Sequence, residues 1–280
     1  MQNSFTVSPV LQEINLKRGD VYQGEITVAN PANASSDLDF KVSLSPYSVT
    51  DGSTPDFQTM SDWSRIVEWT KLDTESGTLK PNETKKIKFT IEVPQDAPSG
   101  GQYLMVGVST EVNDSGATKS IYEMASLVLA RIEGETVHNG TIKENTVPSF
   151  IASGTPVTKF IATNAGNVHE KATVKITIKN TLSGEQIALT DDTDNTYDVT
   201  IMPESERVVE RELKDLPILG IFEVHQDVNY LGNSYEASST MIICPVWFMV
   251  LVLGIIISII GMICYGVHLK RKKMEKTIAI

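Results

Sequence analysis

Two stretches that share one pattern decide the fold predicted here. The first reads ITVANPAN over residues 26–33 and resumes as FKVSL over residues 40–44. The second reads FIATNAGN over residues 160–167 and resumes as VKITI over residues 174–178. Apolar and polar residues alternate in both, as in a half-buried strand, and two asparagines three positions apart follow the first strand. Because asparagine closes turns with its own side chain, each copy predicts a strand, a turn and a second strand.

Three further landmarks occur in the same order in both copies: a proline before a strand, a second proline, and a glycine with an aromatic residue two positions later. They are Pro81, Pro94 and Gly101 with Tyr103 in the first copy, and Pro203, Pro217 and Gly220 with Phe222 in the second. We therefore interpret the chain as two copies of one domain, at residues 1–134 and 135–240. The first copy carries an insertion at residues 46–78. Many short alternating segments joined by turn residues predict an all-β fold of two tandem β-sandwiches.

An apolar run follows the second copy. Residues 241–267 read MIICPVWFMVLVLGIIISIIGMICYGV and contain no Asp, Glu, Lys or Arg. About 20 apolar residues suffice to cross the ~30 Å hydrocarbon core as a helix, so the run predicts a single transmembrane helix. The core helix of a soluble protein rarely stays uncharged on all its faces. Pro245 suits a first helical turn, and Trp247 and Tyr265 suit the two interfacial depths of a bilayer.

The tail at residues 268–280 fixes the predicted orientation. It carries the basic cluster Lys270, Arg271, Lys272 and Lys273. Basic residues beside a span mark the cytoplasmic side, so the tail is expected inside and both domains outside the cell membrane. The alternative, a tail-anchored protein with its domains in the cytosol, would place this cluster outside, against the same rule. Because the sequence opens without a signal-peptide pattern, we expect that an export signal was removed from it.

Charge and cysteine usage narrow the class of protein. The net charge is −11, and the tail contributes about +4, which leaves about −15 on the portion outside the membrane. Such an acidic surface repels phosphate backbones, so nucleic acid is not an expected partner. Both cysteines, Cys244 and Cys264, lie in the apolar run, so the outer portion has no disulfide. This fits a bacterial surface protein better than an animal extracellular one.

Three segments carry a resemblance to a known family. PNET at residues 81–84 and VPQDAPSGGQY at residues 93–103 resemble the late strands of bacterial immunoglobulin-like domains of the PapD-like kind. NAGNVH at residues 164–169 is similar to a turn of those domains. In the PNET segment this chain departs from them, because they usually have glycine where it has Asn82. Two such domains, one C-terminal span and a basic tail are similar in order to the WxL-interacting proteins of Gram-positive bacteria. The resemblance implies immunoglobulin-like sandwiches and a partner at the cell wall, and it identifies no site residue.

One acidic cluster is a candidate cation site. It comprises Asp191, Asp192, Asp194 and Asp198, with Asn195 among them. Carboxylate oxygens are the ligands that Ca²⁺ prefers, but the run lacks the central glycine and closing glutamate of an EF-hand loop. A solvated hairpin loop is therefore the alternative. No other cofactor is expected.

Aromatic residues of the insertion are candidates for partner recognition. Tyr47, Phe57 and Trp63 could form an exposed binding surface. The alternative is that the tryptophans fill the sandwich core, which we expect for Trp69 because Val67 and Trp69 alternate with the polar Glu68. In the transmembrane run, Gly254 and Ser258 are four residues apart, a small-xxx-small pattern that permits a homo-oligomer but is also common in single membrane helices.

Catalytic motifs are missing from the sequence. The four histidines show no metal-ligand spacing, and no nucleophile elbow or phosphate-binding loop is present. We expect a non-enzymatic, membrane-anchored extracellular binding, adhesion or surface-assembly subunit. Its sandwich loops or sheet edges would bind a surface protein or a cell-wall component. The alternative is a membrane-tethered chaperone or scaffold for the assembly of other secreted subunits, which an exposed apolar edge strand in the first domain would favour.

Overall fold

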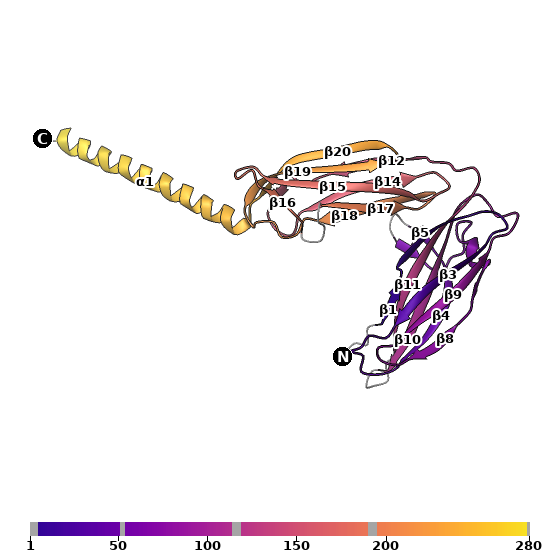
Figure 1. Cartoon of the computed structure of the whole chain (residues 1–280). Helices are drawn as coiled ribbons and strands as arrows, with labels where there is room; N and C mark the ends of the chain where they lie inside the picture. Colours follow the sequence, from indigo (N-terminus) through magenta and orange to yellow (C-terminus); the bar gives the residue numbers. More distant parts are fainter. Residues whose placement is uncertain (1–4, 51–53, 114–118, 190–194, 279–280) are drawn as a thin grey trace.

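Two β-sandwiches in tandem and one C-terminal helix make up the computed structural model (Figure 1). It describes residues 5–50, 54–113, 119–189 and 195–278. The fold class is the one expected: two immunoglobulin-like sandwiches followed by a single apolar helix. The chain passes from the first domain to the second between Ile132, where β11 ends, and Gly140, where β12 begins.

The first domain packs a four-stranded sheet on a five-stranded one. The four-stranded sheet has the order β1 (Thr6–Ser8), β3 (Val21–Ala29), β9 (Thr84–Glu92) and β7 (Thr70–Leu72). The five-stranded sheet has the order β2 (Leu11–Leu16), β11 (Lys119–Ile132), β10 (Gly100–Asn113), β4 (Leu38–Pro46) and β8 (Ser76–Leu79). The chain moves from the first sheet to the second at the cis bond between Ser8 and Pro9.

The core of the first domain follows from the predicted alternation. Along β9, Ile87, Phe89 and Ile91 are fully buried between the sheets, while the lysines beside them face solvent. The insertion adds a two-stranded sheet, β5 (Ser48–Thr50) with β6 (Thr54–Asp56), and the short helix η1 (Arg65–Val67). Trp69 packs against the core of this domain, as expected from the alternation of Val67 and Trp69 with Glu68.

The second domain repeats the arrangement. One sheet has the order β12 (Gly140–Thr146), β14 (Val157–Asn164) and β18 (Ser205–Glu212). The other has the order β13 (Phe150–Ile151), β20 (Asn233–Ile243), β19 (Gly220–Tyr230), β15 (Glu170–Asn180) and β16 (Gln186–Ile187), with β17 (Thr196–Ile201) also paired to β15. Phe160, Val174, Ile176 and Phe222 lie in its core.

The first asparagine of each repeat makes an equivalent hydrogen bond in its domain. The Asn30 side-chain nitrogen donates to the Leu79 carbonyl at 3.0 Å, and the Asn164 nitrogen donates to the Ile201 carbonyl at 3.1 Å. Both amides are buried, so each satisfies a carbonyl that water cannot reach. The asparagine landmark therefore marks structurally equivalent turns.

The glycine–aromatic landmark is not equivalent in the two copies. Gly100 pairs with Ile132 at the end of β11, and Gly220 pairs with Ile243 at the end of β20. The counterpart of Gly220 is thus Gly100 and not Gly101. This slip of one residue moves Tyr103 to the outer face of its sheet, whereas Phe222 lies in the core of the second domain.

The apolar helix begins later than hydropathy predicts. Helix α1 (Val246–Ile278) contains the apolar segment Val246–Val267, which is long enough to cross a membrane. The predicted start at Met241 is wrong, because Met241 and Ile243 are buried core residues of β20. An apolar strand that runs directly into an apolar helix leaves no hydropathy boundary. The second domain therefore extends to Ile243, past the predicted limit at residue 240.

Candidate functional site: the open edge of β11

The strand β11 is paired along its outer edge for only half of its length. β2 runs parallel to it and pairs with residues 127–132. Within the described part of the chain, no strand pairs with the outer edge of β11 over residues 119–126. We refer to this stretch as the open edge. Figure 1 shows it at the end of the first domain that lies away from the second.

The register tells which backbone groups face outward. The Leu127 N–H donates to the Val10 carbonyl at 2.8 Å, so Leu127 turns its backbone groups toward the β2 side. Successive residues of a strand turn these groups to alternate sides. The N–H and C=O groups of Ile121, Glu123 and Ala125 therefore point away from β10, and no strand among the described residues pairs with them.

Apolar side chains accompany these free groups. Ile121 is 67% exposed and Met124 is 42% exposed, while Tyr122 between them is half-buried against the domain core. Val10 and Leu11, at the point where β2 takes over the pairing, are exposed as well. The open edge thus offers backbone hydrogen bonds beside apolar contact area.

The second domain has a comparable edge of different chemistry. β13 pairs with β20 only at Ile242 and Ile243. By the same alternation, Thr240, Ser238 and Glu236 turn their backbone groups to the unpaired side, and all three are exposed polar residues. Over the described residues, the unpaired edge of β11 is thus more apolar than that of β20, which serves as an internal comparison.

A joint between the domains holds the open edge in a fixed place. The Gly101 N–H donates to the Asn167 carbonyl at 2.7 Å, and the His169 N–H donates to the Tyr103 phenol oxygen at 2.9 Å. Lys171 forms an ion pair with Glu13 at 2.6 Å. Each contact joins β10 or β2 of the first domain to the turn before β15 or to β15 itself, so the sheet that contains β11 is held against one end of the second domain.

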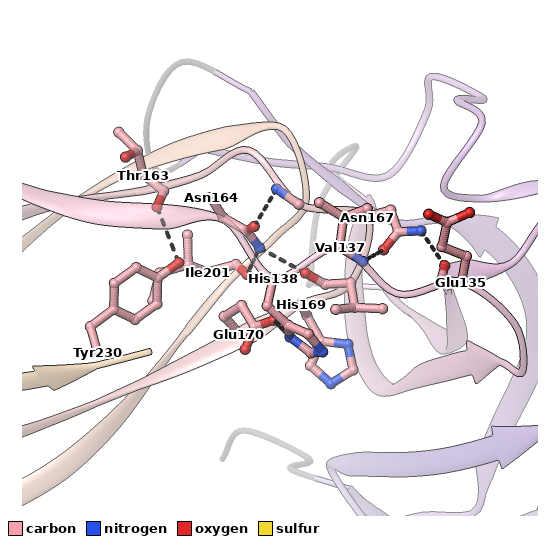
Figure 2. Close-up of polar contacts among 12 residues, drawn as sticks. Glu135, Val137, His138, Thr163, Asn164, Asn167, His169, Glu170, Ile201 and Tyr230 are labelled. Carbon is pink, nitrogen blue, oxygen red and sulfur yellow. Dashed lines mark hydrogen bonds and ion pairs between the residues drawn. The ribbon is translucent and has the colours of Figure 1, made fainter. Parts of the chain in front are cut away.

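The turn of the second asparagine pair also secures the linker. Figure 2 shows Asn167 beside the linker residues Glu135 and Val137. Its side-chain oxygen accepts from the Val137 N–H at 2.7 Å, and its nitrogen donates to the Glu135 carbonyl at 2.9 Å. Next to it, Nδ1 of His138 lies 2.5 Å from a carboxylate oxygen of Glu170, within hydrogen-bond distance. The motif at residues 164–169, predicted as a turn, therefore also holds the linker to the second domain through hydrogen bonds.

Burial determines the charge state of the joint histidine. His169 is buried, which lowers the pKa of its imidazole to about 4, and the Arg131 charge adds to the effect. The Tyr103 oxygen lies 3.3 Å from Nδ1 of this neutral ring, and burial raises the pKa of the phenol. His169 thus contributes to the hydrogen bonds of the joint as a neutral, buried side chain.

The candidate aromatic residues do not form one surface. Tyr47 stacks on Phe57 with ring centres 5.6 Å apart. Tyr47 and Trp63 also pack against an interdomain cluster that includes Tyr103 and Met202, and only Phe57 is exposed. Two of the three residues proposed for recognition thus lie at the joint.

The candidate Ca²⁺ cluster falls largely beyond the described structure. Asp191, Asp192 and Asp194 lie outside the described residues. Asp198 belongs to β17, where its carboxylate accepts a hydrogen bond from the Thr173 hydroxyl at 2.7 Å. Ca²⁺ binding stays a prediction.

The residues predicted to anchor the chain in a membrane lie on or beside α1. Pro245 immediately precedes the helix, and its carbonyl accepts from the Phe248 N–H at 3.0 Å. Trp247 and Tyr265 are exposed near the two ends of the apolar segment. The basic cluster at residues 270–273 continues the helix. The Ser258 hydroxyl donates to the Gly254 carbonyl at 2.9 Å, and oligomerisation through this pair stays a prediction.

Comparisons with known proteins show a distant likeness of layout. No protein-family model and no curated protein matches the sequence. Among solved structures, the class 5 fimbriae chaperone CfaA is similar at 14% identity and a TM-score of 0.41, covering 85% of this chain and 99% of its own. A chain from the complex of the Salmonella enterica SafA pilin with the SafB chaperone is similar at 12% identity and a TM-score of 0.41, covering 86% and 97%. Values this low transfer neither a partner nor a function.

Proposed function

We propose that this chain is a membrane-anchored, non-enzymatic protein-binding subunit that takes up an extended segment of a partner protein along β11. The observation that carries the proposal is the open edge, with its outward backbone groups at Ile121, Glu123 and Ala125. Strand addition uses such groups for affinity and the flanking side chains for selectivity.

The dimensions of the open edge suit a short peptide strand. Outward-facing residues recur every second position, about 6.8 Å apart, so three of them align with a partner segment of roughly five to seven residues. Exposed Ile121 and Met124 would contact apolar side chains of that segment on the two faces of the sheet. An edge with free backbone groups and apolar side chains is costly to leave uncovered, because it invites aggregation.

Anchoring of the chain in a membrane would determine where this binding takes place. The apolar segment of α1 would span the bilayer, with the basic cluster after it on the cytoplasmic side and both sandwiches outside. From the resemblance to WxL-interacting proteins, we further propose that the partner is located at the cell wall. The domain that carries the open edge is the one farther from α1 along the chain.

The open edge favours one form of this function over the other. An unpaired apolar strand suits the transient capture of another secreted subunit, and hence a chaperone or scaffold for assembly. An adhesin would rely instead on exposed side chains such as Phe57. We therefore place assembly first and adhesion second.

Site-specific photo-cross-linking tests the proposal. The photoreactive residue p-benzoylphenylalanine replaces Ile121 in one variant and Thr240, on the polar edge of β20, in a matched control. In intact cells that carry the full chain, the Ile121 position should yield a discrete protein adduct and the Thr240 position should not. No adduct from Ile121, or equal adducts from both positions, would rule out β11 as the binding edge.

A further inference from the structure

One end of the second domain faces the membrane helix. We call it the helix-proximal pole, formed by the loops at residues 152–156, 181–185 and 213–219 with the strand ends beside them. The register brings them together, because Gly220 pairs with Ile243 at the end of β20 and Phe222 pairs with Asn180 at the end of β15. Figure 1 shows α1 leaving from this pole, opposite the joint with the first domain.

Exposed apolar side chains of the second domain gather at this pole. Over the described residues between 140 and 243, the large exposed hydrophobic residues are Phe150, Leu182, Ile218, Leu219, Ile221 and Ile242, together with Val157 at the start of β14. Leu182 is 83% exposed and Ile218 is 73% exposed. Side chains this apolar and this open to water are unusual when they cluster on one surface.

Three of them form a row across the sheet. Phe150 pairs with Ile242, and Ile242 pairs with Ile221, so the three side chains lie side by side on the outer face. Farther from α1, the outer-face positions of β19 and β20 are polar throughout. They are Glu223, His225, Asp227 and Asn229 on β19, and Thr240, Ser238, Glu236 and Ser234 on β20. The face changes from polar to apolar only in its last row.

The length of the connection fixes what this row can touch. Only Cys244 and Pro245 separate β20 from α1. The three steps from Ile243 to Val246 reach at most about 10 Å when fully extended. The polar interfacial layer of a bilayer is about 5–7 Å thick on each side. A helix that spans the hydrocarbon core from Val246 therefore brings the helix-proximal pole to the level of the headgroups.

We propose that the helix-proximal pole is a second membrane-contact site, in which these apolar side chains insert among lipid headgroups around the point where α1 enters. The inference rests on the membrane anchoring proposed above. The second domain then rests on the bilayer surface in a fixed orientation and does not rotate freely about the connection to α1. The joint therefore sets the orientation of the first domain relative to the membrane.

The chemistry of the pole indicates which lipid it needs. Charged residues there are mixed in sign, with Lys179 and Lys214 against Glu185, Glu212 and Asp215, and Lys214 lies 3.7 Å from Glu212 as an ion pair. Contact therefore depends on apolar insertion and not on anionic headgroups. We expect it in neutral phosphatidylcholine, with no loss at high salt.

Spin-label depth measurements test the proposal on the full chain in phosphatidylcholine nanodiscs. Cys244→Ser and Cys264→Ser provide a cysteine-free background. A nitroxide is then placed singly by Ile218→Cys or Leu182→Cys at the pole, by Asn233→Cys at the opposite end of the domain, and by Val250→Cys in α1. Power saturation compares collisions with oxygen, which concentrates in lipid, and with a water-soluble nickel chelate.

The four positions separate the outcomes. We expect labels at 250, 218 and 182 to favour oxygen and the label at 233 to favour nickel. If the label at 250 is in lipid while those at 218 and 182 are in water, the pole does not contact lipid and the inference fails, although the anchor stands. A label at 250 in water overturns both. Labels at 218 and 182 shielded from both reagents would show a protein contact, such as a second copy of this chain, in place of lipid.

Discussion

The phenol oxygen of Tyr103 accepts a hydrogen bond from the His169 N–H at 2.9 Å and lies 3.3 Å from Nδ1 of the same residue. The phenol and Nδ1 of the neutral imidazole are within hydrogen-bond distance, and the tautomer of the ring decides which of the two donates. One residue from each domain thus completes the hydrogen bonds of the other at a buried place. The joint is therefore sensitive both to substitution and to acid.

Tyr103→Phe should weaken the joint. The substitution keeps the ring but leaves the buried His169 N–H without its acceptor, which costs about 1–3 kcal/mol. Urea unfolding of the full chain in detergent measures the loss, with Tyr22→Phe as the control because the ring of Tyr22 packs only against the core of the first domain. Equal stability of the Tyr103→Phe and Tyr22→Phe variants would show that the contact does not hold the domains.

Acid should destabilise the protein through His169. Its folded-state pKa is about 4, against about 6.5 in the unfolded chain, so the unfolded state binds more protons between these values. The stabilisation is fully present above pH 6.5 and is lost as the pH falls toward 4, by up to about 3 kcal/mol.

His169→Gln is the matching control for this pH dependence. Carboxylates also contribute to acid unfolding, so the informative quantity is the difference between the two proteins. We expect urea midpoints of the wild type to fall more steeply between pH 6.5 and 4.5 than those of His169→Gln. Parallel curves would mean that His169 is solvated in the folded state.

Asn164→Ala and Asn30→Ala should each destabilise their own domain. Asn164 bridges the carbonyls of Ile201 and Val168, and its loss leaves both buried without a donor. We expect a cost of about 3 kcal/mol. Asn33→Ala, at an exposed asparagine of the same repeat, should change stability by less than about 0.5 kcal/mol. Thermal melts of the variants check this order, and equal effects at positions 30 and 33 would contradict it.

Glu204→Asn should stabilise the second domain. Glu204 has a φ of 50°, and its counterpart in the first domain, Asn82, has a φ of 68°. Left-handed backbone costs an ordinary residue about 1 kcal/mol and is better tolerated by asparagine. The gain expected in denaturant unfolding is about 0.5–1 kcal/mol. A loss of stability would show that the Glu204 side chain makes a contribution larger than the strain.

The sequence predicts the strands and the repeat well because both depend on local pattern. Alternation at residues 87–93 and 174–178 corresponds to β9 and β15, and the asparagines mark equivalent turns. It misplaces the start of α1, because buried Met241 and the exposed residues of the apolar helix are equally apolar. It also misaligns Tyr103, because a one-residue slip of register leaves no trace in composition.

The open edge and the joint could not be predicted from the sequence. Whether β11 is paired depends on where β2 begins beside it, which is a relation between segments more than 100 residues apart. The contact of Tyr103 with His169 likewise depends on how two domains meet. Local pattern carries no information on either.

Proline substitution tests the central claim most directly. In Glu123→Pro an outward-facing N–H is removed from β11, and in Ser238→Pro one is removed from the polar edge of β20. Proline is tolerated where the N–H faces solvent, so both variants should fold, which circular dichroism verifies. The measurement is the amount of partner protein recovered with the full chain after chemical cross-linking of intact cells. We predict that Glu123→Pro loses the partner and Ser238→Pro keeps it; wild-type recovery with Glu123→Pro would contradict binding at the open edge.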